Sequence, residues 1–203
     1  MANILAPVTP VARASLPTRY GAFDIAVFQV QGAPNDALAV IRGAPDGPLP
    51  PLVRLHSECL TGDVLGSLRC DCGEQLEASL ALMAEADAAV LLYLRQEGRG
   101  IGLANKIRAY ALQDRGLDTV DANLALGLPV DRREYASAAA VLRYLGAARV
   151  RLLTNNPAKH EQLEAHGVEV VERVPLVMPP NAVNGAYLRT KADRMGHLIA
   201  FER

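Results

Sequence analysis

Apolar residues in the first third of the chain come in short runs separated by turn residues. Runs at 23–28, 37–41 and 52–56 follow or flank glycine and proline clusters, which is typical of strands rather than helices. The segment 43–51, GAPDGPLPP, separates the last two runs and predicts a loop. We therefore expect an antiparallel β region here. Residues 1–16 lack periodicity and predict a tail or an edge segment.

The spacing changes after residue 71 to one that favours helices between buried strands. Leu76, Leu80 and Met83 recur at helical intervals, and similar stripes follow. The expected helices are 76–83, 103–111, 135–142, 157–166 and 187–198, and the expected strands are 88–94, 150–153 and 168–171. Asn156 before Pro157 predicts a helix cap. The fold class is then α/β (α+β mixed), an N-terminal β region joined to a sheet with flanking helices, with 17–203 as one domain.

Composition and charge exclude several classes of protein. The 203 residues carry 21 basic and 22 acidic side chains and are 50% hydrophobic, so a disordered chain is excluded and no global field favours nucleic acid or a membrane surface. The apolar runs are far shorter than the ~20 residues of a membrane span, and the start lacks a basic signal region. We expect a cytoplasmic protein with no nucleic-acid or membrane partner.

Three cysteines cluster within fourteen residues: Cys59, Cys70 and Cys72. This spacing lets three thiolates converge on one zinc ion. Three protein ligands leave the fourth position open for water, unless a histidine such as His56 closes it as a structural site. Three unrelated buried thiols are the remaining alternative.

Three further segments carry candidate chemistry, each with a plainer alternative. Gly98, Gly100 and Gly102 surround Arg99 between a predicted strand and helix, which predicts either a phosphate cradle or a simple turn. Asp131 and Glu134 have the spacing of a capping box, which predicts that they cap the following helix. A capping aspartate can also be catalytic, so both roles remain open for Asp131. Two further candidates, Thr154 at a strand end and Lys159 in a first helical turn, lie where open α/β sheets bind ligands, although Lys159 is equally well explained as a solvated lysine.

The remaining charged segments are less informative. His160, His166 and His197 lie in or beside predicted helices, where a lone histidine is usually a surface or structural residue. The segment 190–197, TKADRMGH, is most simply a partly solvated helix face.

Five ordered motifs together resemble GTP cyclohydrolase II. They are RLHSECLTGD (54–63), LRCDCG (68–73), RQEGRGIG (95–102), NKIRAYALQD (105–114) and LLTNNP (152–157). The resemblance runs from about residue 16 to residue 197. It implies hydrolysis of GTP at two centres in riboflavin synthesis, giving formate, pyrophosphate and a 2,5-diamino-6-ribosylamino-pyrimidinone 5'-phosphate.

The resemblance also implies a site. One zinc per subunit would be held by Cys59, Cys70 and Cys72, with a water that attacks guanine C8. GTP contacts carry over to Arg54, Leu55, His56, Ser57, Glu58, Gln75, Glu97, Gly98, Arg99, Thr119, Thr154 and Lys159. We expect the basic members and Arg133 to converge on the triphosphate, with Mg2+ as a second cofactor. A homodimer is implied.

Catalytic roles follow from the same resemblance. Asp131 would be the proton acceptor, and Arg133 either the nucleophile on the α-phosphorus or a stabiliser of phosphoryl charge, since a guanidinium is normally protonated. Tyr110 would position substrate or water, with a core aromatic as its alternative. A catalytically silent nucleotide-binding module with structural zinc is the competing hypothesis. A zinc nucleobase deaminase needs both H-x-E and P-C-x-x-C, and it is excluded because the P-C-x-x-C motif does not occur.

Overall fold

The computed structural model describes residues 6–199 and divides the chain into two compact units. The first, which we call the sheet unit, comprises Met1–His56, Glu77–Arg95 and Glu134–Leu176. The second, which we call the cysteine unit, comprises Ser57–Leu76, Gln96–Arg133 and Val177–Arg203. Each unit is assembled from segments that are distant in the sequence.

A seven-stranded mixed sheet forms the centre of the sheet unit, which confirms the expected α/β class. Its strands are β1 (Val8–Thr18), β2 (Gly21–Val30), β3 (Ala37–Arg42), β4 (Leu52–Ser57), β5 (Ala89–Leu94), β6 (Arg149–Leu153) and β7 (Glu169–Val174), in the order β1-β2-β3-β5-β4-β6-β7. The pairs β1–β2, β2–β3 and β3–β5 are antiparallel, whereas β4–β6 and β6–β7 are parallel. β1 is the edge strand, so residues 8–16 form an edge segment.

The expectation of antiparallel pairing throughout the first third is wrong for β4. Although β3 and β4 are consecutive in the sequence, β5 lies between them, so the proline-rich loop at 43–51 is a crossover rather than a hairpin. β4 instead pairs in parallel with β6. This places the carboxyl ends of β4 and β6 at the same edge of the sheet.

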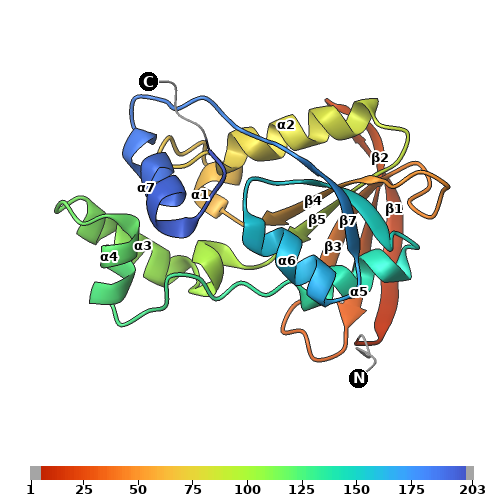
Figure 1. Ribbon diagram of the computed structural model, residues 1–203, viewed down its shortest axis with the longest axis horizontal. Helices are drawn as coiled ribbons and strands as arrows, with labels where there is room; N and C mark the ends of the chain where they lie inside the picture. Colours follow the sequence, from red (N-terminus) through yellow and green to blue (C-terminus); the bar gives the residue numbers. More distant parts are fainter. Residues whose placement is uncertain (1–5, 200–203) are drawn as a thin grey trace. The chain divides into compact units, whose positions relative to one another are not determined.

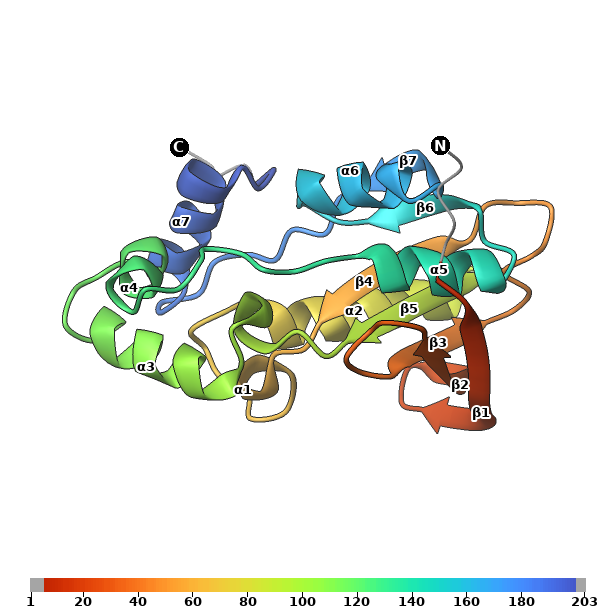
Figure 2. The ribbon, with the colours of Figure 1, turned by 90° about the horizontal axis from the view of Figure 1, so that it is seen from below.

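Helices α5 (Ala136–Tyr144) and α6 (Pro157–Ala165) complete the sheet unit, and Figure 2 shows α5 lying along the sheet with α6 beside it. Buried alanines of α5 and aliphatic side chains of the strands form one continuous apolar core. Asn156 caps α6 as predicted, because its Oδ1 accepts a hydrogen bond from Ala158 N at 3.0 Å. Helix α2 (Cys72–Glu85) begins in the cysteine unit and ends in the sheet unit.

The cysteine unit consists of short helices around the cysteine segment (Figure 1). They are α1 (Leu60–Asp63), the 3₁₀ turn η1 (Glu97–Gly100), α3 (Leu103–Gln113), α4 (Thr119–Ala125) and α7 (Gly185–Met195). The predicted apolar stripe of α3 is wrong in direction, because Leu103 and Ile107 are 40% and 47% exposed while Lys106 and Ala109 are buried. None of the helices within residues 6–199 has both the length and the apolar character needed to cross a bilayer.

Candidate functional site

The three cysteines converge in the cysteine unit. Cys59 precedes α1, Cys70 lies in the following turn and Cys72 begins α2. Their Sγ atoms all lie within 4.8 Å of one another, and those of Cys59 and Cys70 are 3.7 Å apart. Among residues 6–199 this is the one group of histidine, cysteine or carboxylate ligands close enough to hold a metal.

Gly62 keeps the space beside the sulfur atoms open. A Cβ on Gly62 would lie 2.9 Å from Cys70 Sγ, closer than real Cβ contacts allow, and 3.2 Å from Cys59 Sγ, which is a tight contact. Thiolates are preferred ligands of zinc, and three of them in a closed turn fit a catalytic or structural tetrahedral site. The residues present therefore fit a zinc ion.

The thiols do not titrate alike. Hydrogen bonds from Cys70 and Cys72, and then from Lys106, lower the pKa of Cys59 well below its usual range. The hydrogen bond to Cys59 raises the pKa of Cys70 to about 11, and the pKa of Cys72 is raised as well. The Cys59 thiolate thus forms readily, and its negative charge disfavours ionisation of the other two thiols. A divalent cation removes this penalty, because it binds the thiolates and displaces the remaining protons.

A buried ion pair adjoins the cluster. Lys106 Nζ lies 3.0 Å from Cys59 Sγ and 2.8 Å from Glu97 Oε1. The Glu97 carboxylate also accepts hydrogen bonds from Leu60 N at 2.7 Å and from Gly98 N at 2.8 Å. Burial lowers the pKa of Lys106, but the bonds to Glu97 and Cys59 raise it by more, so the amine stays protonated. Glu97, expected to bind substrate, thus anchors the cysteine segment.

The glycine loop around Arg99 does not form a cradle of free amides. The N–H groups of Gly98, Gly100 and Gly102 donate to Glu97 Oε1, Gln96 O and Glu97 O. The interpretation as a backbone phosphate cradle is therefore wrong, because internal hydrogen bonds occupy the amides. Gly98 and Arg99 both have φ of 62°, a conformation that costs energy for arginine.

The strained backbone at Arg99 positions its guanidinium. Its Nη1 is buried and has no hydrogen-bond partner within residues 6–199, and its Cζ lies 6.0 Å from the centre of the Tyr187 ring. A buried N–H group without a partner costs free energy. The side chain of Arg99, not the backbone of the loop, is therefore the group suited to an anion.

Asp131 and Arg133 form a bidentate pair. Arg133 Nε lies 2.9 Å from Asp131 Oδ1, and Arg133 Nη2 lies 2.5 Å from Oδ2. Burial raises the pKa of Asp131, but the hydrogen bond and charge of Arg133 and the charge of Arg99 lower it by more. The carboxylate therefore stays ionised.

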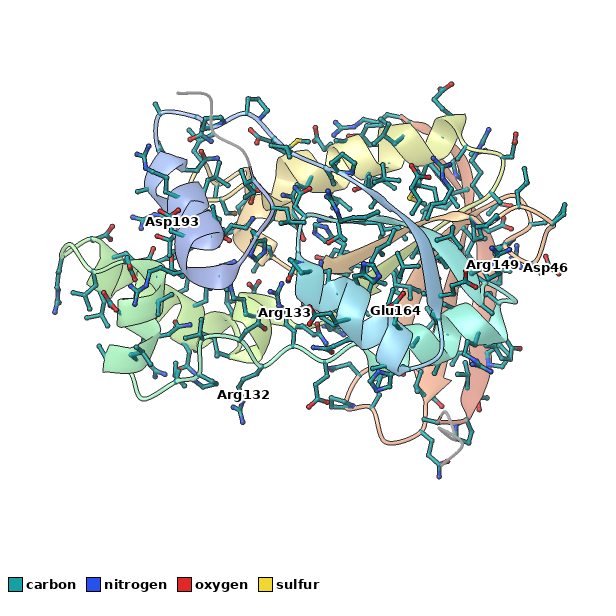
Figure 3. All side chains as sticks on the ribbon, viewed as in Figure 1. Asp46, Arg132, Arg133, Arg149, Glu164 and Asp193 are labelled. Atoms are coloured by element: carbon teal, nitrogen blue, oxygen red, sulfur yellow. The ribbon has the colours of Figure 1, made fainter. Side chains whose placement is uncertain are left out.

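The predicted capping box at Asp131 and Glu134 is wrong. Helix α5 begins at Ala136, after the box, and its N-cap residue Tyr135 has no side-chain cap. The Asp131 carboxylate instead accepts from Arg133, so its local partner is the side chain two residues ahead rather than a helix terminus. Figure 3 shows the Arg132 side chain extending away from the ribbon.

Helix α7 contacts the cysteine segment through Lys191. Its Nζ lies 2.8 Å from Asp71 Oδ1, and the two side chains are only 10% and 2% exposed. Gln75 Nε2 donates to the other Asp71 oxygen at 2.5 Å. The solvated-face interpretation of this helix is therefore wrong for Lys191, which is buried because its partner lies between two cysteines.

His197 also differs from a plain surface histidine. Burial, followed by the positive charges of Lys191, Arg133 and Arg99, lowers its pKa to about 3, so the ring is neutral near pH 7. Tyr187 shares these surroundings, and burial raises its pKa well above the usual range. The C-terminal segment thus places two neutral polar side chains, His197 and Tyr187, near the charged groups of the cysteine unit.

Tyr110 of α3 lies in the same unit. Its hydroxyl is 3.4 Å from Thr61 Oγ1, and Lys106 Nζ lies 5.8 Å from the centre of its ring. Burial raises the pKa of Tyr110, so the phenol keeps its proton. Thr61 Oγ1 is in turn 3.7 Å from Cys59 Sγ, which connects the phenol to the cysteine cluster.

The other expected GTP contacts in the cysteine unit are less closely grouped. Ser57 donates to Gln96 Oε1 at 3.5 Å, and Glu58 is half-buried next to Cys59. Thr119 is the first residue of α4, directly after its N-cap Asp118.

The remaining candidates lie in the sheet unit, within β4, directly after β6 and in the first turn of α6. Arg54 Nη1 donates to Leu153 O at 3.1 Å, and Lys159 Nζ donates to Leu55 O at 2.6 Å. Thr154 is buried, and its hydroxyl accepts from Asn156 N at 3.0 Å. Lys159 is only 5% exposed, so its interpretation as a solvated lysine is wrong.

His56 has a defined place in the sheet unit. Its ring stacks on that of Tyr93, with centres 5.5 Å apart and planes inclined by 22°. It is 2% exposed.

The expected residues divide between the two units. Cys59, Cys70, Cys72, Gln75, Glu97, Gly98, Arg99, Tyr110, Asp131 and Arg133 belong to the cysteine unit, and Arg54, Leu55, His56, Thr154 and Lys159 to the sheet unit. Two lysines, Lys106 and Lys191, had no assigned role in the sequence. Lys106 contacts Glu97, nine residues away, and Cys59, 47 residues away, while Lys191 contacts Asp71, 120 residues away. None of these separations is a helical interval, so no local pattern signals the pairs.

Comparison with known proteins agrees with the motifs. The family model of GTP cyclohydrolase II matches residues 9–175. The chain is 53% identical to GTP cyclohydrolase-2 of Acinetobacter baumannii (strain SDF), with 95% of this chain and 96% of that protein covered. It is 52% identical to GTP cyclohydrolase-2 of Picrophilus torridus, with 93% of this chain and 97% of that protein covered. It is 54% identical to GTP cyclohydrolase-2 of Proteus mirabilis, with 93% of this chain and 95% of that protein covered.

A solved structure shares the fold at low identity. It is a two-domain 3,4-dihydroxy-2-butanone 4-phosphate synthase from A. baumannii, 20% identical, with a TM-score of 0.50. The match covers 84% of this chain and 40% of that one, so it concerns the fold alone. The family model and the identities above 50% decide the assignment: the chain belongs to the GTP cyclohydrolase II family of enzymes.

Proposed function

We propose that this protein hydrolyses GTP, opening the imidazole ring of guanine and releasing formate and pyrophosphate, as the first step of riboflavin synthesis. The product would be 2,5-diamino-6-(5-phospho-ribosylamino)pyrimidin-4(3H)-one. One observation carries the proposal beyond family membership. A group of three cysteines close enough to hold a metal lies in the same compact unit as Arg99 and the Asp131–Arg133 pair, so candidate ligands for a metal and candidate groups for a phosphate are both present.

Cys59, Cys70 and Cys72 would hold one zinc ion per subunit. A zinc ion with three protein ligands supplies a Lewis acid and lowers the pKa of bound water. The protein's own contribution is to keep the cluster closed and charged: Glu97 anchors the chain after Cys59, and Gly62 leaves the sulfur atoms room. Tyr110, held near Cys59 through Thr61, would position substrate or water.

Arg99 and Arg133 would act on the phosphates. An ionised Asp131 orients Arg133 through two hydrogen bonds, and Arg133 would either attack the α-phosphorus or stabilise its charge as pyrophosphate leaves. A bidentate pair with a carboxylate of lowered pKa favours a guanidinium that keeps its proton, so the structure supports charge stabilisation more than nucleophilic attack. Asp131 would accept a proton only after this pair opens.

Residues of the sheet unit would contact GTP as well. Arg54 in β4 and Lys159 in the first turn of α6 are buried cations that donate to backbone oxygens of Leu153 and Leu55. Together with Thr154, Leu55 and His56, they would contact GTP, as would Ser57, Glu58, Gln75, Glu97, Gly98 and Thr119 of the cysteine unit. Mg2+ would accompany the triphosphate, since polyphosphate chemistry needs its charge neutralised. We further propose a cytoplasmic homodimer whose residues 17–203 act as a single catalytic domain.

The test is a turnover assay on zinc-loaded protein with GTP and Mg2+, in which formate and pyrophosphate are measured separately. The parent protein should release both, while Asp131→Asn should lose most activity. Arg132→Lys is the matched control for Arg133→Lys, because the Arg132 side chain points outward (Figure 3). Activity that survives in Arg133→Lys together with a trapped covalent guanylyl adduct, detected by mass spectrometry, would refute a guanidine nucleophile.

Two outcomes would contradict the proposal as a whole. Zinc-loaded protein that binds GTP but releases neither formate nor pyrophosphate would be a silent nucleotide-binding module. Loss of zinc from His56→Ala, with the fold retained, would indicate a closed site of three cysteines and one histidine, which leaves no position for water.

A further inference from the structure

Lys106 is placed to act on the metal site rather than on the solvent. It lies on the buried face of α3, is 8% exposed, and its Nζ is shared between Cys59 Sγ at 3.0 Å and Glu97 Oε1 at 2.8 Å. A buried ammonium is costly unless it is paired, and Glu97 alone would satisfy that need. The additional contact with a ligand sulfur calls for a different explanation.

Charge supplies that explanation. Three thiolates on a divalent zinc ion leave the cluster with one net negative charge, and Glu97 adds another nearby. Thiolates donate electron density strongly to a metal and thereby weaken it as a Lewis acid. A hydrogen bond from an ammonium to one of these sulfur atoms withdraws part of that density, and such outer contacts are known to tune metal sites.

We propose that Lys106 is a positioning residue of the metal centre: its ammonium, held by Glu97, donates a hydrogen bond to the Cys59 ligand and keeps a three-thiolate zinc ion sufficiently Lewis-acidic. This inference rests on the metal binding within the proposed function and on no other part of it. Lys106 does not touch the reacting atoms. It acts through Cys59.

Three variants separate this role from a merely structural one. Lys106→Met removes the donor at similar length, Lys106→Arg keeps a charged donor, and Arg108→Met changes an exposed cation two residues along the same helix. Each full-length protein is loaded with Co2+ as a spectroscopic substitute for zinc, and its sulfur-to-cobalt charge-transfer bands are recorded. Zinc affinity is measured separately by competition with a chromophoric chelator.

Lys106→Met should bind zinc about 10- to 100-fold more weakly, because Cys59 loses the contact that holds its sulfur atom in place. Its charge-transfer bands should move to lower energy, because the sulfur atom regains electron density. Lys106→Arg should move both measurements back towards the parent, and Arg108→Met should match the parent. If Lys106→Met does not fold, Lys106→Gln, with a neutral donor, should show a smaller shift in the same direction.

Unchanged bands and affinity in a folded Lys106→Met protein would overturn the inference while leaving the proposed function intact. A parent protein that binds neither zinc nor Co2+ would overturn both. The two failures are therefore distinguishable.

Discussion

The contact between Lys191 and Asp71 allows a prediction of stability with a worked magnitude. Asp71 is 2% exposed, and Lys191 and Gln75 both donate to its carboxylate. Removing one partner of a buried ion pair typically costs about 3–5 kcal/mol, because the remaining charge is left buried. Gln75 would still donate a hydrogen bond to one oxygen of the Asp71 carboxylate. We therefore expect Lys191→Met to lower the free energy of unfolding by about 3 kcal/mol, at the lower end of this range.

Urea unfolding of zinc-loaded protein, followed by circular dichroism, provides the measurement. Arg189→Met is the control, since Arg189 lies on the exposed face of the same helix, and it should change stability by less than about 0.5 kcal/mol. The double variant Asp71→Asn/Lys191→Met removes both charges. It should be less destabilised than the sum of the single variants, by about 1–3 kcal/mol.

Additive effects in this cycle would refute the reasoning, because they would show that the two charges do not interact in the folded protein. A loss below about 1 kcal/mol in Lys191→Met would refute it as well. Either result would mean that α7 is not held to the cysteine segment by this pair.

Three further predictions concern single side chains. The pKa of His197 is lowered to about 3 in the folded protein. Below the ordinary pKa of about 6.5 the unfolded chain binds a proton that the folded protein does not, so stability decreases as the pH decreases. From pH 7 to pH 5 the parent should lose about 2 kcal/mol more of its free energy of unfolding than His197→Gln does, as measured by paired denaturation curves. Gly62→Ala should weaken zinc binding by about tenfold or more, measured against a chelator, because its Cβ would collide with a ligand sulfur; Gly185→Ala, whose Cβ would meet nothing closer than 3.7 Å, is the control. Arg99→Ala should raise KM for GTP by about 10- to 100-fold, the value of a hydrogen bond to a charged group, whereas an equal rise in Arg132→Ala would contradict a specific phosphate contact.

Hydrophobic spacing predicted most elements of the sheet unit, because burial on a sheet face or helix stripe is a local property of the sequence. It failed where tertiary contacts determine the outcome. The stripe at Leu103 and Ile107 is apolar, yet α3 buries Lys106, whose ammonium has partners there in Glu97 and Cys59. Helix α4 was not predicted because it is short and because no extended apolar run follows its N-cap residue, Asp118.

The cysteine cluster was predictable from the sequence because its members lie within fourteen residues. The charges that surround it were not. Lys191 contacts Asp71 across 120 residues, and Lys106 contacts Cys59 across 47. Local patterns report local hydrogen bonds. A hydrogen-bonded pair between residues that are distant in the sequence produces no local pattern.

The measurement that tests the central claim most directly follows the carbon atom that ring opening removes. GTP labelled with 13C at C8 is incubated with zinc-loaded protein and Mg2+, and the products are observed by 13C NMR. We predict that the label appears in formate, in step with pyrophosphate, and that removal of zinc by a chelator abolishes the transfer. Label that remains in an intact guanine ring while pyrophosphate is released would contradict the account, because the protein would then act on the phosphates alone.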